Sequence, residues 1–186
     1  MPADFATALA SIRAAELRPE IVIEETPAPQ RLSPFAVALQ AEVLVGEDEA
    51  ASGRFVLLHD PTGQEPWDGE FRVVTFAKGT VELDIAEDPM LTEVAWAWLE
   101  EALEARGAAY RAESGTVTRT ASQSFGEIAD RAPSGDVEIR ASWTPLVTSA
   151  DDVTRHLMSW SELLCTTAGL PPLPEGVVVM SARRRR

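Results

Sequence analysis

The sequence has few of the side chains from which metal and redox sites are built. Its 186 residues include one cysteine, Cys165, and two histidines, His59 and His156. A single cysteine excludes a disulfide within the chain and agrees with a reducing compartment. With so few ligands a zinc site of the usual kind cannot be assembled, and no calcium-binding loop motif occurs. We therefore predict neither a metal nor a cofactor.

Motifs for nucleotides, for a nucleophilic serine and for membrane insertion are absent as well. The glycines stand singly, so neither a P-loop nor a GxGxxG turn is present, and no GxSxG elbow occurs. No apolar run approaches the ~18 residues that cross a bilayer. The first ten residues, MPADFATALA, lack the basic and apolar regions of a signal peptide. We expect a cytoplasmic protein that does not enter membranes.

Positive charge is scarce, and the net charge is −14. The 16 basic residues include the last four, so residues 1–182 carry 12 bases against 30 acids, or −18. Such a surface repels nucleic-acid phosphates and anionic lipids. Nucleic-acid binding is therefore unlikely except through the terminal arginines, Arg183, Arg184, Arg185 and Arg186.

One segment, residues 79–105, holds eight acids and no base. Glu100 and Glu104 are among these acids. They form either a solvated face or a surface for a basic protein partner.

Hydrophobic periodicity predicts a single α+β domain over residues 1–178 and a flexible arginine-rich tail at 179–186. Helices with an apolar stripe are expected at 3–16, 88–107 and 150–168. Strands are expected at 20–26, 35–45, 54–59, 71–77, 116–125 and 136–143. This order predicts an antiparallel sheet of about five to six strands with helices packed on it, in the pattern α-β-β-β-α-β-β-α.

Three of these elements carry further predictions. The strand at 54–59 is apolar on both alternating faces, which indicates a central strand covered at least in part on both sides. The helix at 88–107 has a wide apolar stripe, so a homodimer through this helix is one option. The strand at 116–125 places alternate hydroxyl groups on one face, for solvent or for a polar ligand.

The segment LLHDPTGQEPWDGEF, residues 57–71, is the first candidate for a site. Its DPTG tetrapeptide matches a type I turn in which Asp60 accepts backbone hydrogen bonds, and a second turn would give Gly69 a positive φ. Trp67 is expected to anchor the loop, since a tryptophan buries ~150–250 Å². Strand alternation places His59 at the rim of the apolar face, where a structural role is expected before a catalytic or ligand-binding one.

Arg119 lies on the opposite face of its strand from the hydroxyl groups and would need a carboxylate partner if that face is covered. No residue is predicted to be catalytic. The candidate ligand or partner surface consists of His59, Asp60, Trp67, Arg119, Glu100 and Glu104.

Four segments resemble a known family: GRFVLLHDPTGQEPWDGEFRVVTFAKG, RGAAYRAESGTVTRTASQSFG, VEIRASWTP and LLCTTAGLPPLPEGVV. The family consists of uncharacterised actinobacterial proteins and is classified as a domain of unknown function. The likeness covers about residues 17–178. It implies no activity, cofactor or catalytic residue. Genes of this family often lie beside one for a ribonuclease D-like exonuclease, which implies an accessory role in RNA metabolism as one option.

The order of elements is also similar to that of type III secretion chaperones, which are dimers that hold partner chains on sheet and helix surfaces. We therefore expect a non-enzymatic, adaptor- or chaperone-like module that binds another protein. The alternative is a small enzyme or ligand-binding protein that uses the loop after His59. A further alternative is an accessory factor in RNA metabolism.

Overall fold

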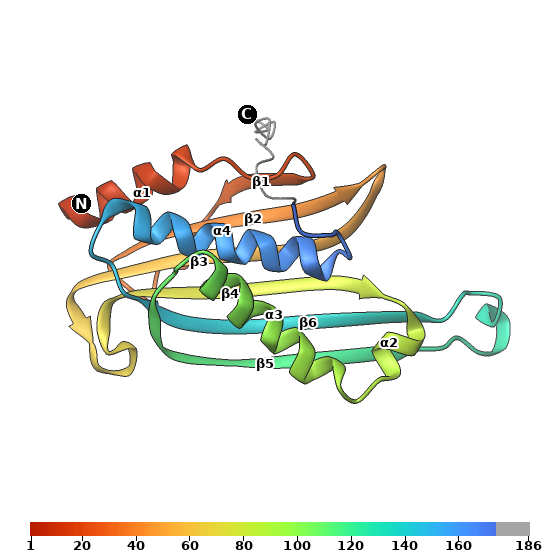
Figure 1. Ribbon diagram of the computed structural model, residues 1–186. Helices are drawn as coiled ribbons and strands as arrows, with labels where there is room; N and C mark the ends of the chain where they lie inside the picture. Colours follow the sequence, from red (N-terminus) through yellow and green to blue (C-terminus); the bar gives the residue numbers. More distant parts are fainter. Residues whose placement is uncertain (174–186) are drawn as a thin grey trace.

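Six strands form one open antiparallel sheet in the computed structural model, which describes residues 1–173. Their order across the sheet is β1-β2-β3-β4-β6-β5 (Figure 1). The predicted α+β class and strand number are confirmed, while the predicted tail at 179–186 lies outside the described residues. The strands are β1 (Ile21–Thr26), β2 (Phe35–Val45), β3 (Asp48–Gln64), β4 (Gly69–Val81), β5 (Tyr110–Ser122) and β6 (Ser134–Pro145).

Four α-helices lie on one face of this sheet (Figure 1). The central helix α4 crosses β3, β4 and β6, while α3 crosses β5 and β6 and α1 packs beside α4. The strand expected at 20–26 is present as β1, so four strands precede α3 instead of the three in the predicted pattern, and the short α2 before α3 was not predicted. The helices are α1 (Ala3–Ala14), α2 (Leu83–Glu87), α3 (Leu91–Ala105) and α4 (Ala150–Thr167), and two 3-10 turns are η1 (Glu65–Trp67) and η2 (Gly126–Ile128).

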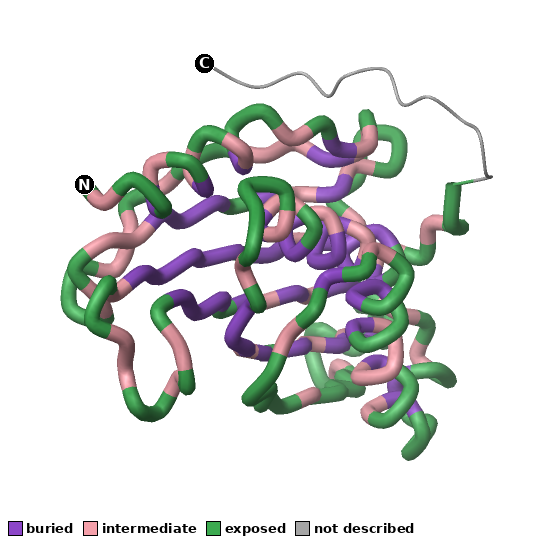
Figure 2. The backbone as a smooth tube through the Cα atoms, turned by 60° about the vertical axis from the view of Figure 1, so that its left-hand side comes forward, coloured by how far each residue is buried: buried purple, intermediate pink, exposed green. Residues whose placement is uncertain are grey.

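The main core lies between this helix layer and the sheet. The α4 stripe of Val153, Leu157, Trp160 and Leu164 is almost completely buried, as its spacing of four, three and four residues predicts. Trp160 also donates a hydrogen bond from Nε1 to the carbonyl of Phe76, at 3.1 Å. Figure 2 shows buried residues along the central strands and beneath the helices, with the connecting loops exposed.

Two strand glycines allow α4 to lie close to the sheet. A Cβ added at Gly79 would come within 2.5 Å of the Thr167 carbonyl oxygen. One added at Gly53 would lie 2.7 Å from a methyl group of Leu164. Both glycines therefore fix the approach of the helix, because any side chain would force backbone or core atoms apart.

The helix ends are held by local polar groups. The carboxylate of Asp152 accepts hydrogen bonds from the amides of Thr148 and Ser149, both at 2.8 Å, at the start of α4. These bonds lower the pKa of Asp152 to about 2. The helix predicted to begin at Asp88 begins instead at Leu91, because Asp88 forms a preceding turn in which its Oδ1 accepts from the Met90 amide at 2.8 Å.

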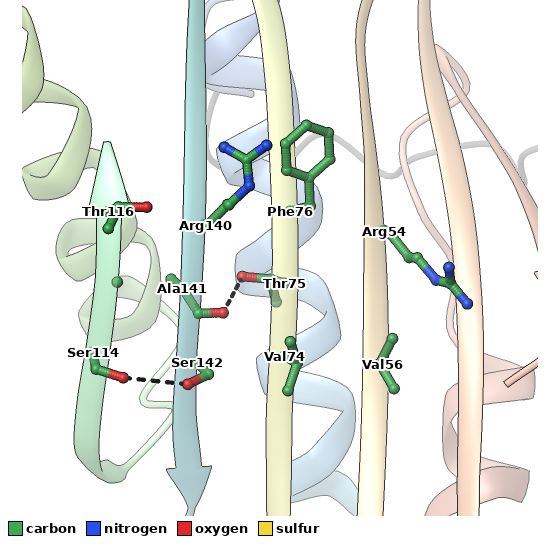
Figure 3. A pocket seen from close by; sticks show the side chains of 11 residues that line it. Arg54, Val56, Val74, Thr75, Phe76, Ser114, Thr116, Arg140, Ala141 and Ser142 are labelled. Carbon is green, nitrogen blue, oxygen red and sulfur yellow. Dashed lines mark hydrogen bonds between the residues drawn. The ribbon is translucent and has the colours of Figure 1, made fainter. Parts of the chain in front are cut away.

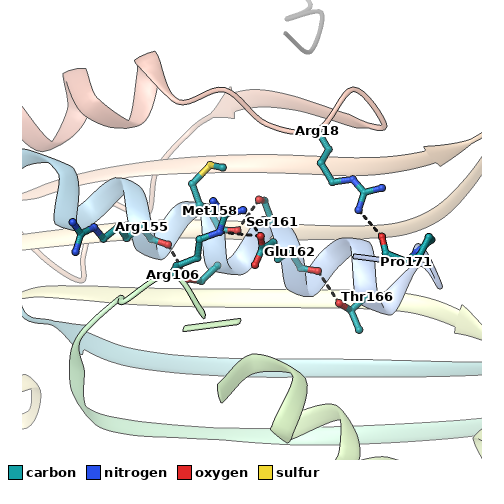
Figure 4. Close-up of polar contacts among 9 residues, drawn as sticks. Arg18, Arg106, Arg155, Met158, Ser161, Glu162, Thr166 and Pro171 are labelled. Carbon is teal, nitrogen blue, oxygen red and sulfur yellow. Dashed lines mark hydrogen bonds and ion pairs between the residues drawn. The ribbon is translucent and has the colours of Figure 1, made fainter. Parts of the chain in front are cut away.

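Polar contacts also join α4 to its neighbours on the outer side of the helix layer (Figure 4). Arg106, which follows α3, donates from Nε to Glu162 at 2.9 Å. Arg18 donates from Nη1 to the carbonyl of Pro171 at 2.9 Å, just after α4. These contacts within the chain hold the helices together as one layer on one face of the sheet.

Candidate functional site

The predicted site residues do not come together. Arg119 pairs across the sheet with Val137, then with Gly79, then with Ala51. Ala51 lies eight residues before His59 on β3, which corresponds to ~27 Å at ~3.4 Å per residue. The structure therefore does not form the predicted ligand site between His59 and Arg119.

His59 is surrounded by aromatic rings on the helix-covered face of the sheet. Its side chain is 1% exposed and stacks on Phe5 with ring centroids 5.8 Å apart. Phe71 and Phe35 lie at 4.2 and 6.2 Å on either side. Neither ring nitrogen has a hydrogen-bond partner among the described residues. This position favours the structural role for His59, since its ring packs against three phenylalanine rings.

Asp60 has the local role that its turn motif predicts. Its Oδ1 accepts from the Thr62 hydroxyl at 2.7 Å and from the Thr62 amide at 3.0 Å, and these bonds lower the pKa of the carboxyl group. The prediction for Gly69 was wrong, because Asp68 takes the positive φ of 53°. Gly69 is instead a point of close approach, where a Cβ would lie 2.8 Å from the Thr144 methyl group.

Arg119 has no ion pair among the described residues, so the expected carboxylate partner is not found. Its Nη1 donates to the backbone carbonyls of Ala86 and Glu87, at 2.9 and 3.2 Å. These carbonyls end the short helix α2. The side chain is exposed, so water and the carbonyl oxygens solvate its charge without a carboxylate.

Glu100 and Glu104 lie on the outer side of α3, away from the other candidates. Glu100 accepts a hydrogen bond from Nε1 of Trp96 at 3.0 Å. Burial raises the pKa of the nearby Tyr110, and the charges of Glu113, Glu100 and Glu104 raise it further. This surface is acidic as predicted, and whether a basic partner binds there stays a prediction.

The apolar stripe of α3 is used within the chain. Its buried residues pack on the sheet and on α4, while Val94 is 43% exposed. The width of the stripe therefore reflects contacts on two sides within the chain, and a homodimer through this helix stays a prediction. The buried stripe consists of Leu91, Ala95, Leu99, Ala102 and Leu103.

The other face of the sheet carries no helix among the described residues. Its first row of side chains runs across four strands, where Arg54, Phe76, Arg140 and Thr116 are paired in register. The Arg140 guanidinium lies 5.0 Å from the centroid of the Phe76 ring, as a cation–π contact. Arg140 also donates to Glu138 at 2.8 Å.

A second row lies two residues along each strand and is apolar on one side and hydroxylic on the other. It consists of Val56, Val74, Ser142 and Ser114 (Figure 3). The hydroxyl oxygens of Ser142 and Ser114 are 3.4 Å apart, and Val74 is 36% exposed. The two rows line an open hollow of about 610 Å³.

Within residues 1–173, only one end of this face is covered. Trp67 packs there against a small buried cluster of Ala38, Val56 and Leu58, so it anchors the loop on the side away from the helices. The expectation that strand 54–59 is covered in part on both sides agrees with this arrangement. Beyond Val56, toward β5, the described residues leave the hollow open.

A buried arginine lies next to the hollow. Arg72 is 7% exposed and donates to the Ala112 carbonyl at 2.8 Å, to the Thr144 hydroxyl at 3.0 Å and to the Ser142 hydroxyl at 2.8 Å. No carboxylate within residues 1–173 forms an ion pair with it. Burial lowers the pKa of Arg72, but a guanidinium remains charged at neutral pH.

The charge at the hollow thus opposes the charge of the chain. Arg54 and Arg140 line it, Arg72 lies behind Ser142, and no acidic side chain is part of its lining. The sequence alone did not indicate these residues, because they are up to 86 positions apart and only strand register brings them together. Alternation within each strand gives the face of a residue, but not its neighbours on other strands.

Other chemistry is sparse in the described residues. No group of three His, Cys, Asp or Glu side chains within residues 1–173 is placed to hold a metal ion. Burial raises the pKa of Cys165 to about 11, so its thiol is a poor nucleophile. None of the helices in this part of the chain is long and apolar enough to cross a membrane.

A family model described as "Protein of unknown function (DUF3000)" matches residues 1–178. The chain belongs to the DUF3000 family. The predicted membership of an uncharacterised family is confirmed, while an actinobacterial origin stays a prediction. Searches of curated proteins and of solved structures found no match. For this DUF3000 protein, function has to be argued from the surface itself.

Proposed function

We propose that this DUF3000 protein is a non-enzymatic binding module that holds a partner protein on the uncovered face of its sheet. The observation that supports the proposal is the hollow over β3, β4, β6 and β5, where Val74 and Phe76 form an apolar floor next to the buried Val56. Contiguous apolar surface of this kind on a soluble protein marks an interaction site. The chain folds its helices onto the opposite face, so this one is left for a partner.

The shape of the hollow favours a protein over a small substrate. Small-molecule pockets enclose most of their ligand, whereas this hollow is open along a sheet face of the described residues. Its lining contains no His, Cys, Asp or Glu that could act as a general base or as an acidic or thiol nucleophile. Binding without catalysis is therefore the function that this surface supports best.

The proposed mode is adaptor- or chaperone-like. Apart from β1 and α2, the order of elements is that of type III secretion chaperones, which hold partner chains on sheet and helix surfaces. That likeness is a fold-level analogy, and the hollow gives it a specific place on this chain. A cytoplasmic location, a basic partner at Glu100 and Glu104, and RNA contact through residues 183–186 stay predictions.

The test compares two exposed valines. Val74→Asp places a charge in the floor of the hollow, while Val94→Asp places the same charge on the outer side of α3. The tagged wild-type chain and both variants are purified from the native host, after urea unfolding has shown equal stability. We expect one protein to co-purify in stoichiometric amount with wild type and Val94→Asp, and to be lost from Val74→Asp. Retention by Val74→Asp, or equal loss from both variants, would overturn the proposal.

A further inference from the structure

Arg72 is a buried cation with no counter-charge from the described chain. Its three hydrogen bonds go to neutral oxygens, one backbone carbonyl and two hydroxyls. Burial of an ion without an opposite charge is unfavourable even when its hydrogen bonds are satisfied. An anion bound close to Arg72 would offset part of the free-energy cost of burying its charge.

The Ser142 hydroxyl connects Arg72 to the hollow. Its oxygen accepts from Arg72 Nη2 at 2.8 Å, so the hydroxyl hydrogen is free to be donated elsewhere. Ser142 lines the hollow, and its oxygen lies 3.4 Å from the hydroxyl oxygen of Ser114 on β5 (Figure 3). Two hydroxyl groups, one of them polarised by a guanidinium, therefore face the same space, and one hydroxyl hydrogen remains to be donated when the other lies between the two oxygens.

The other charged groups at the hollow have the same sign. Arg54 donates from Nη2 to the Pro27 carbonyl at 3.0 Å and makes no ion pair among residues 1–173. Arg140 shares the single carboxylate of Glu138 with Lys78, whose Nζ lies 3.8 Å from Glu138 Oε1. The lining of the hollow is therefore positive in a chain of net charge −14, while Glu24, Glu42 and Glu138 lie on the same face of the sheet outside that lining.

We propose that the partner is acidic, and that an extended segment of it places a carboxylate at the hydroxyl groups of Ser114 and Ser142, next to Arg72 and one row away from Arg140. The same segment places an aliphatic or aromatic side chain on Phe76, in the neighbouring row. Alternate residues of an extended chain are ~7 Å apart, which is also the separation of the two rows along each strand. The preferred sequence therefore has Asp or Glu two positions from an apolar residue.

This inference rests on the proposed function, and it commits to a protein segment because the hollow is open and continues along the sheet. A small amphiphilic acid, such as a fatty acid, shares the carboxylate and the apolar body. A second copy of the chain is the other possible occupant. Both are treated as outcomes of the test.

The probe is a phage library of random 12-residue peptides, selected on the purified chain and counter-selected on Val74→Asp. We expect enriched peptides to carry Asp or Glu two positions from Leu, Ile, Val or Phe. Synthetic copies are then titrated by fluorescence anisotropy. Arg140→Gln should weaken binding about 3-fold, because it removes a positive charge that lies one row away from the bound carboxylate. Arg131→Gln, an equal charge change in the exposed β5–β6 loop, should leave affinity unchanged.

Other outcomes separate the two proposals. Neutral or basic peptides whose binding is lost in Val74→Asp but unchanged in Arg140→Gln would overturn the acidic partner and leave the proposed function standing. If no peptide is enriched and dodecanoate binds in a way that Val74→Asp abolishes, both proposals are overturned. Both are also overturned if sedimentation shows a dimer of the chain that Val74→Asp dissociates, or if neither peptide nor dodecanoate binds.

Discussion

Protonation of His156 should destabilise the fold in a defined pH range. The ring is fully buried, and burial lowers its pKa from 6.5 to about 4. Its Nδ1 accepts a hydrogen bond from Nε1 of Trp143 at 3.0 Å, so the ring proton of the neutral form lies on Nε2. Protonation would place an N–H on Nδ1 against the N–H of Trp143, which adds a repulsive contact to the loss of hydration.

The sign of the effect follows from proton binding. Because the pKa is lower in the folded state, the unfolded chain binds more protons between pH 6.5 and 4, and stability falls as pH falls through this range. With ~1.4 kcal/mol per pKa unit, the loss attributable to His156 is about 2 kcal/mol at pH 5 and about 3 kcal/mol at pH 4. Above pH ~7 the contribution is constant.

The assay compares wild type with His156→Asn by urea unfolding from pH 7.5 to pH 4. Asparagine keeps an acceptor for Trp143 but does not titrate, and His59 is present in both chains, so other titrations largely cancel. Wild type should be the more stable chain at pH 7.5, and this advantage should shrink by about 2 kcal/mol at pH 5. An advantage that stays constant with pH would show that burial does not exclude the proton from His156.

Three further perturbations address the packing and the local chemistry. Gly79→Ala should lower the free energy of unfolding by about 1–3 kcal/mol, because its methyl group meets the Thr167 carbonyl. Thr80→Ala, at an exposed neighbour, should change it by under about 0.5 kcal/mol, and equal effects would contradict the close approach. Asp152→Ala should cost about 1–2 kcal/mol in urea unfolding at pH 7, and a change within error would exclude a capping role. Cys165 should react with a disulfide reagent at pH 8 about 100-fold more slowly when folded, whereas equal rates would show an accessible thiol.

Much of the fold could be predicted from periodicity, and the errors have physical causes. The α4 stripe around Trp160 indicated its buried face correctly, since apolar spacing and burial have the same origin. The strand expected at 116–125 begins at Tyr110, because an exposed edge strand needs no apolar alternation. Helix α2 was missed because its five residues are too few to show a period.

The candidate site could be predicted much less well. The segment at 57–71 attracted attention because it combines His59, Asp60 and Trp67, yet strand alternation directs His59 to the covered face and Asp60 bonds within its own turn. The hollow depends on residues such as Arg54 and Arg140, which are unremarkable singly. Their common position follows from the pairing of four strands, and pairing between distant strands is not contained in any local pattern.

Site-specific photo-crosslinking in living cells tests the binding role of the uncovered face most directly. A benzophenone amino acid is placed at Val74 in one chain and at Val94 in another, and both are irradiated in the native host. We predict that position 74 joins one partner protein with high yield, that position 94 does not, and that Arg140→Gln lowers the yield at 74. A partner that crosslinks equally from both positions, or only from 94, would contradict the proposal that the uncovered face of the sheet binds the partner.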